Sequence, residues 1–168
     1  MTMEARRLIR HLLWPNRRVR RAFSASTLSA ITIAIRAAER HHDGEIRFAL
    51  EAALDPMALL RGVTPRDRAI ETFSQLRVWD TENNNGVLIY VLLADRAVEI
   101  VADRGAQACT GREAWAVICR QIESDFGRDD YQFGALAGIE AVARALGKPI
   151  ADRDGRSNEL PDDPVVVF

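Results

Sequence analysis

Two apolar segments joined by a tight turn occupy the middle of the chain and limit the folds open to it. Residues 87–94 are apolar without alternation, as expected of a strand that is covered on both faces. Residues 97–103 alternate between apolar and polar side chains, and Asp95 with Arg96 provides a short turn between the two segments. The pattern predicts an antiparallel hairpin whose first strand lies in the centre of a sheet.

A further strand is expected before the hairpin. Residues 45–52 alternate, and a helix whose start is marked by Thr64, Pro65 and Asp67 separates them from the hairpin. Two strands joined through a helix pair in parallel, with a right-handed crossover. The sequence therefore predicts a small mixed sheet between helices. The other helices that we expect are 26–40, a helix capped by Thr110 and ending at Gly127, and 131–146.

The chain contains no internal repeat and no linker rich in Gly or Ser, so we expect one domain with two extensions. The extensions are a basic N-terminal arm, 1–21, and an extended C-terminal tail, 151–168, on either side of an α/β domain, 22–150. Residues 165–168 of the tail either add a short edge strand to the sheet or dock in a groove.

Charge is unevenly distributed, although the formal net charge is only −1. Residues 1–21 hold seven arginines against Glu4, so the rest of the chain is acidic and is expected to repel nucleic acid. The arm also carries Leu12, Leu13 and Trp14. Such a basic amphipathic segment contacts either an anionic membrane surface or an acidic partner, or it forms a short helix on the protein's own acidic surface.

A membrane-spanning segment is not expected. The uncharged stretch 22–35 is shorter than the ~20 residues that cross a bilayer, and it is interrupted by Ser and Thr. No signal-peptide pattern is evident at the N-terminus. The sequence predicts a cytoplasmic protein, peripheral to the membrane if it contacts one.

The familiar catalytic motifs are missing from the sequence. It has no GxSxG, Walker loop, HExxH, or GxGxxG after a strand, so no nucleotide cofactor is expected and any hydrolysis would be metal-assisted. Cys109 and Cys119 form no CxxC pair and are interpreted as structural. His41 and His42 lack a third His or Cys nearby, which disfavours a zinc site.

Polar residues from three segments are expected at one edge of the predicted sheet. These segments are the turn before Glu45, the loop 80–86, and the residues Asp103 and Arg104 after the third strand. Their carboxylate and amide oxygens are the ligands that Ca²⁺ and Mg²⁺ prefer, and Arg104 could bind phosphate. The helix expected to begin at Thr110 would add backbone N–H groups that suit an anion. On spacing alone, however, the loop is not an EF-hand and is more typical of a turn that enters a strand.

The segments 44–47, 85–91 and 95–105 resemble the TPM domain family. The similarity extends over roughly 22–165, and the Asn-Glu-Leu-Pro-Asp tail at 158–162 is similar to a short, soluble bacterial subgroup. The resemblance implies a three-layer α/β/α sandwich with a small mixed sheet of about four strands.

Members of this family are often called phosphatases, and some relatives bind Ca²⁺. The resemblance therefore implies a domain that binds Ca²⁺ or Mg²⁺ and has weak phosphatase activity. The alternative is a non-catalytic interaction module that acts with a membrane-bound partner. The metal ligands expected at the predicted edge are Asp80, Asn84, Asn85 and Asp103. The residues expected around them are Glu45, Asp95, Arg104 and Gly105.

Overall fold

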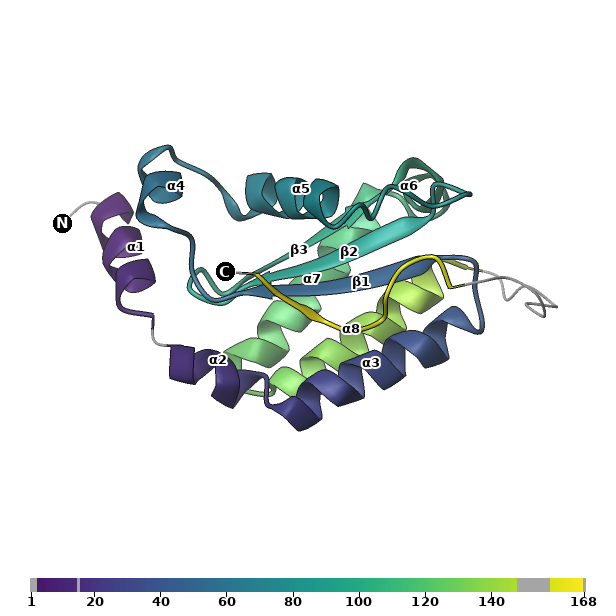
Figure 1. Cartoon of the computed structure of the whole chain (residues 1–168), viewed down its shortest axis with the longest axis horizontal. Helices are drawn as coiled ribbons and strands as arrows, with labels where there is room; N and C mark the ends of the chain where they lie inside the picture. The colour runs from purple at the N-terminus through teal and green to yellow at the C-terminus, as the bar shows by residue number, and fades with distance from the viewer. Residues whose placement is uncertain (1–2, 15, 148–157, 168) are drawn as a thin grey trace.

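The computed structural model describes residues 3–14, 16–147 and 158–167, and the chain folds around one mixed sheet (Figure 1). The strand order is β3–β2–β1–β4, with β1 parallel to β2 and to β4, and β3 antiparallel to β2. The predicted hairpin and mixed four-stranded sheet are thereby confirmed, and the tail supplies the fourth strand. The strands are β1 (Glu45–Glu51), β2 (Gly86–Leu92), β3 (Ala97–Ala102) and β4 (Val165–Val167).

Helices cover both faces of this sheet, as expected of an α/β sandwich (Figure 1). One face packs on α3 (Ala25–Glu39), α7 (Arg112–Gly127) and α8 (Tyr131–Ala145), and the other packs on α5 (Pro65–Gln75). Within the described ranges, no helix has the length and apolar character needed to cross a membrane. The short helices are α1 (Met3–Leu12), α2 (Asn16–Ala22), α4 (Pro56–Leu60) and α6 (Arg104–Thr110).

Local capping signals predicted one helix start correctly and misplaced another. Thr64 and Asp67 form the expected capping box at the start of α5. The helix expected to begin at Thr110 instead begins after Gly111, because α6 occupies the preceding residues. The Thr110 hydroxyl donates to the carbonyl oxygen of Ala145, 2.7 Å away, and therefore does not cap α7. The helix that begins at the predicted edge is therefore α6, and N–H groups at its start bond to the Asp103 carboxylate and the Asn84 carbonyl.

One face of β1 is mostly polar and is nevertheless buried; its residues are Glu45, Arg47, Ala49 and Glu51. The Arg47 guanidinium donates to backbone carbonyls of the C-terminal segment, among them that of Asp163 at 3.2 Å. Glu51 accepts from the Tyr90 hydroxyl at 2.6 Å and from Arg68 at 2.8 Å. Because Arg47 and Glu51 have these partners, the tail and α5 can cover them without leaving either charge uncompensated.

Gly86 provides a test of the packing at the start of β2. A Cβ atom at this position would lie 1.9 Å from the carbonyl oxygen of Val78, a backbone atom that cannot rotate away. We expect Gly86→Ala to lower the free energy of unfolding by about 2 kcal/mol or more, measured by urea denaturation.

Gly127→Ala is the matched control for Gly86→Ala. Gly127 is the last residue of α7, and its added Cβ would meet nothing within 4 Å. The control should be neutral or more stable by up to about 1 kcal/mol, because Ala has the higher helix propensity. Equal stability changes in the two variants would contradict the packing described for Gly86.

Candidate functional site

The loop 80–86 and the start of α6 are joined through backbone hydrogen bonds. The carbonyl oxygen of Asn84 accepts from the N–H groups of Gly105 at 2.8 Å and Ala106 at 3.4 Å, and the N–H of Asp103 donates to the carbonyl of Gly86 at 2.9 Å. The Asn84 carbonyl thereby satisfies two N–H groups at the helix start that would otherwise lack acceptors. Two of the three segments predicted to meet at this edge are thus in direct contact.

Gly105 allows the loop to approach α6 this closely. A Cβ atom at position 105 would lie 2.7 Å from the carbonyl oxygens of both Asn83 and Asn84. The neighbouring Asp103 caps α6, because its Oδ1 accepts from the N–H of Arg104 at 2.7 Å. The role of Gly105 at this edge is therefore to permit a backbone contact, whereas Asp103 presents a carboxylate and Arg104 is exposed.

The third segment, the turn before β1, contacts this edge through Asn85 of the loop. Only 8% of the surface of Asn85 is exposed. The side-chain amide of Asn85 donates to the carbonyl of Asp43, and its backbone N–H donates to Thr81 Oγ1 at 3.1 Å. Glu45 N–H donates to the Asn85 carbonyl at 3.3 Å. The turn before β1, the loop before β2 and the residues after β3 therefore share one edge of the sheet, as the sequence predicts.

Two side-chain oxygens at this edge are shielded from solvent and accept no hydrogen bond from the residues that the structure describes. They are Asn85 Oδ1 and Asp103 Oδ2. A buried acceptor left without a donor costs about 1–3 kcal/mol, so such atoms usually contact water or an ion. No group of three or more His, Cys, Asp or Glu side chains in the described ranges could hold a metal ion. A hard cation at this edge would therefore depend on amide and carbonyl oxygens as well as carboxylate.

Three of the predicted site residues have other partners. Asp80 forms a surface ion pair of 2.5 Å with Arg77. Glu45 lies at the edge but is buried beneath the C-terminal segment, where it accepts from the N–H of Leu160 at 3.3 Å. Asp95 lies in the turn between β2 and β3, at the opposite end of the hairpin from Asp103. The structure thus separates Asp95 from the other predicted residues.

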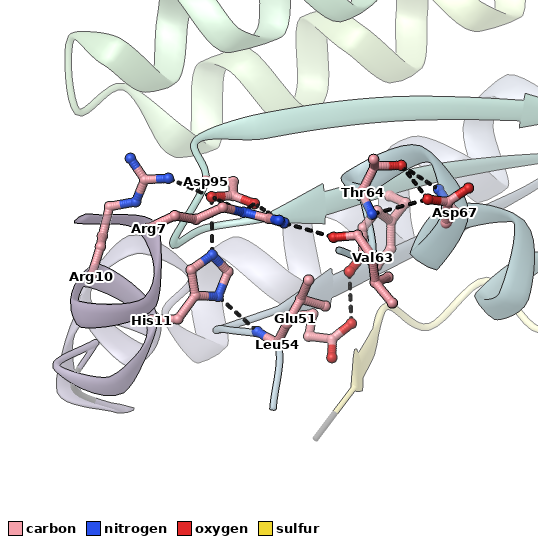
Figure 2. Close-up of polar contacts among 10 residues, drawn as sticks. Arg7, Arg10, His11, Glu51, Leu54, Val63, Thr64, Asp67 and Asp95 are labelled. Carbon is pink, nitrogen blue, oxygen red and sulfur yellow. Dashed lines mark hydrogen bonds and ion pairs between the residues drawn. The ribbon is translucent and has the colours of Figure 1, made fainter. Parts of the chain in front are cut away.

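Figure 2 shows that Asp95 anchors the N-terminal helix α1. Arg7 approaches the carboxylate to 2.7 Å, Arg10 also pairs with it, and His11 Nε2 lies 2.9 Å from Oδ1. Because His11 Nδ1 accepts from the N–H of Leu54, the proton of a neutral ring is on Nε2 and donates to Asp95. Burial alone would raise the pKa of Asp95, but the hydrogen bonds from His11 and Arg7 outweigh it and hold the pKa well below its usual value. The basic arm therefore does contact the protein's own surface.

A second buried group, which the sequence analysis did not single out, lies where α3 meets the tail. Glu39 is 3% exposed, its Oε1 accepts from the N–H of Ile46 at 2.7 Å, and its side chain is hydrogen-bonded to Asp162. Burial is the main cause that raises the pKa of Glu39 from 4.5 to about 8; the hydrogen bond from Ile46 opposes the shift, and the nearby Glu45 and Asp162 carboxylates add to it. Asp162 also pairs with Arg36 at 3.0 Å. Glu39 is therefore protonated at neutral pH in the folded protein.

The raised pKa of Glu39 predicts a specific pH dependence of stability. Unfolding restores the ordinary pKa, so the free energy of unfolding should fall as the pH rises from about 4.5 to about 8. Glu39→Gln retains a neutral side chain with an acceptor for Ile46. This variant should lose that pH dependence and, above pH 8, should exceed the wild type in stability by on the order of 1–3 kcal/mol.

Urea denaturation at a series of pH values measures this effect. Glu140→Gln is the control, because Glu140 is exposed and forms a surface ion pair with Arg144 four residues on, so this variant should follow the wild-type pH profile. Parallel pH profiles for Glu39→Gln and the wild type would show that Glu39 is ionised in the fold.

Comparison with known proteins places this architecture in a family. The model of the family described as TPM domain matches residues 19–145. The NMR structure of BA42 protein from the psychrophilic bacterium Bizionia argentinensis is similar, with 31% sequence identity and a TM-score of 0.73 over 86% of this chain and 94% of that one. The solution NMR structure of the N-terminal domain of a protein from P. gingivalis shares the fold, with 22% identity and a TM-score of 0.60 over 73% of this chain and 75% of that one.

No functionally curated protein matches the chain. The family match nevertheless extends from α2 to the end of α8 and contains the loop 80–86, Asp103 and Gly105. The predicted family resemblance is therefore confirmed, and the chain belongs to the TPM domain family.

Proposed function

We propose that this TPM domain binds a divalent cation, Ca²⁺ or Mg²⁺, at the edge formed by the loop 80–86 and residues 103–105. The observation that carries the proposal is the pair of shielded oxygens, Asn85 Oδ1 and Asp103 Oδ2, which accept no hydrogen bond from the described residues. A hard cation satisfies oxygen atoms of this kind, and it does so with carboxylate, amide and backbone carbonyl ligands together.

The residues at the edge would contribute different oxygen ligands to the cation. Asp103 supplies the negative charge, and the Asn85 amide supplies a neutral oxygen next to the buried start of β2. Asn84 and Asp80 lie in the same loop and are available from its exposed side, although Asp80 would first have to leave Arg77. Because the edge has few carboxylates, Ca²⁺, which accepts amide and carbonyl oxygens in variable geometry, suits it better than Mg²⁺.

Weak hydrolysis of phosphate monoesters is the activity that would follow from such a site. A bound divalent ion neutralises charge on a phosphoryl oxygen and lowers the pKa of a bound water. Arg104 is exposed and directly follows Asp103, so its guanidinium can bind the phosphate group of a substrate. Asp103 remains oriented by its hydrogen bond to the N–H of Arg104.

The cation site can be tested by titrating the protein with CaCl₂ and, separately, MgCl₂ while backbone amide signals are recorded by NMR. The amide signals that shift should be confined to residues 80–86 and 103–106. Asp103→Asn should weaken binding by on the order of tenfold or more, because it removes the ligand charge.

Asp130→Asn is the matched control for the titration. It removes the same charge from an exposed carboxylate that makes no capping hydrogen bond at the start of α8, and the affinity should stay as in the wild type. Absence of any response at millimolar Ca²⁺ and Mg²⁺, or equal weakening in both variants, would contradict the proposed site.

The phosphatase activity requires its own measurement. Hydrolysis of para-nitrophenyl phosphate by the wild type should require added divalent ion, and kcat/KM should fall by about 100-fold in Asp103→Asn. Arg104→Ala should raise KM more than it lowers kcat, since Arg104 is expected to bind substrate. Turnover that persists unchanged in Asp103→Asn would instead identify a contaminating enzyme.

A second candidate function is a non-catalytic interaction module that acts in the cytoplasm with a membrane-bound partner. The observation that favours it is a group of exposed aliphatic side chains on α1 and α4. These side chains lie next to the arginine-rich N-terminal segment.

A further inference from the structure

The helices α1 and α4 lie side by side (Figure 1), and exposed apolar side chains belong to both helices and to the residue that follows α1. Two of them are almost fully open to solvent, Leu13 with 74% and Leu60 with 71% of its surface exposed. Contiguous exposed apolar patches on a small domain commonly mark an interaction site. We call this surface the α1–α4 patch, and its members are Ile9, Leu12, Leu13, Met57 and Leu60.

Contacts on the opposite side of α1 determine the direction in which the patch faces. His11 is buried there, between Asp95 and the N–H of Leu54, and Arg7 bonds to Asp95 and to the carbonyl of Val63 at 2.9 Å. Leu54 and Val63 lie on either side of α4 in the sequence. These polar contacts (Figure 2) hold one side of α1 against the protein beside α4, whereas Ile9, Leu12 and Leu13 are exposed.

The surroundings of the patch are strongly cationic. Residues 5–22 contain seven arginines and no Asp or Glu. Arg7 and Arg10 pair with Asp95, whereas Arg17 and Arg21 on α2 are exposed. The remaining arginines of this segment, all exposed, are Arg6, Arg18 and Arg20. Aliphatic side chains beside a group of arginines are the combination found in helices that lie in the interface of an anionic membrane.

We propose that the α1–α4 patch docks on the surface of an anionic lipid bilayer, with the aliphatic side chains below the headgroups and the arginines at the lipid phosphates. All five side chains of the patch are exposed, and none of them lines the cavity between α3 and α8. A bilayer accepts protruding side chains without a complementary shape, whereas a protein partner would have to provide one. The proposal is independent of the cation site, which lies at the other end of the β2–β3 hairpin.

Sedimentation of the full-length protein with lipid vesicles tests the proposal. The probes are vesicles of phosphatidylcholine alone and vesicles of phosphatidylcholine with phosphatidylglycerol. The protein should sediment with the anionic vesicles and stay in solution with the neutral ones. Raising the salt concentration from about 0.1 M to about 0.5 M should release most of it, because arginine–phosphate attraction is screened.

Paired variants separate the apolar contribution from the charge contribution. Leu12→Asp with Leu13→Asp should weaken vesicle binding by on the order of tenfold or more. Its control, Ile33→Asp with Phe133→Asp, makes the same change at exposed positions of α3 and α8 and should bind like the wild type.

The contribution of the arginines is tested with a second double variant and its control. Arg17→Glu with Arg21→Glu should abolish binding to anionic vesicles at low salt. Reversing two exposed arginines of α7, in Arg112→Glu with Arg120→Glu, should have little effect. Circular dichroism melts of all four variants verify that each is folded.

Three outcomes would overturn the proposal. In the first, the wild type fails to sediment with anionic vesicles at low salt, and the patch would then belong to a protein contact. In the second, the variants of the patch and their controls bind vesicles equally. In the third, the wild type forms a dimer that the Leu12 and Leu13 changes dissociate, which would assign the patch to a second copy of the chain.

Discussion

The backbone carbonyl of Asn84 holds the candidate cation edge together. By accepting from the N–H groups of Gly105 and Ala106, it joins the loop before β2 to the start of α6, while the Asp103 side chain caps the same helix through the N–H of Arg104. At this edge Asp103 Oδ2 and Asn85 Oδ1 are shielded from solvent without a donor from the described residues, and a positive ion is the partner we propose for them.

The two ends of the chain are attached to the sheet by different kinds of interaction. At the carboxyl ends of β1 and β2, Asp95 binds α1 through two arginines and His11, and so presents the proposed lipid-binding patch. Residues 161–163 of the tail are bound near the amino end of β1 through Arg47 and through the hydrogen bond between Glu39 and Asp162, and β4 then pairs with the carboxyl-terminal half of β1. The proposed lipid-binding patch and the proposed cation site lie at opposite ends of the β2–β3 hairpin, so the two would use different surfaces of the domain.

Local patterns predicted the elements well, and long-range partners explain what they did not predict. The apolar run that became β2, the alternation in β3 and the capping box at Thr64 all depend on neighbours in sequence. The role of Asp95 depends on Arg7 and His11, which are more than 80 positions away in the chain. Asp95 was predicted near the cation site, but it lies at the other end of the β2–β3 hairpin. The burial of Glu39, one of the polar residues before β1, likewise could not be predicted from its neighbours in sequence, because it involves Asp162 of the tail. The contact between the loop 80–86 and residues 103–106 could be predicted because strand pairing alone brings these segments together.

A crystal structure of the protein determined in millimolar CaCl₂ would show directly whether an ion binds at the proposed cation site. The account predicts an ion at the edge between the loop 80–86 and α6, ligated by side-chain oxygens of Asn85 and Asp103 at about 2.3–2.6 Å. An edge without an ion, in which ordered water donates hydrogen bonds to both oxygens, would contradict it.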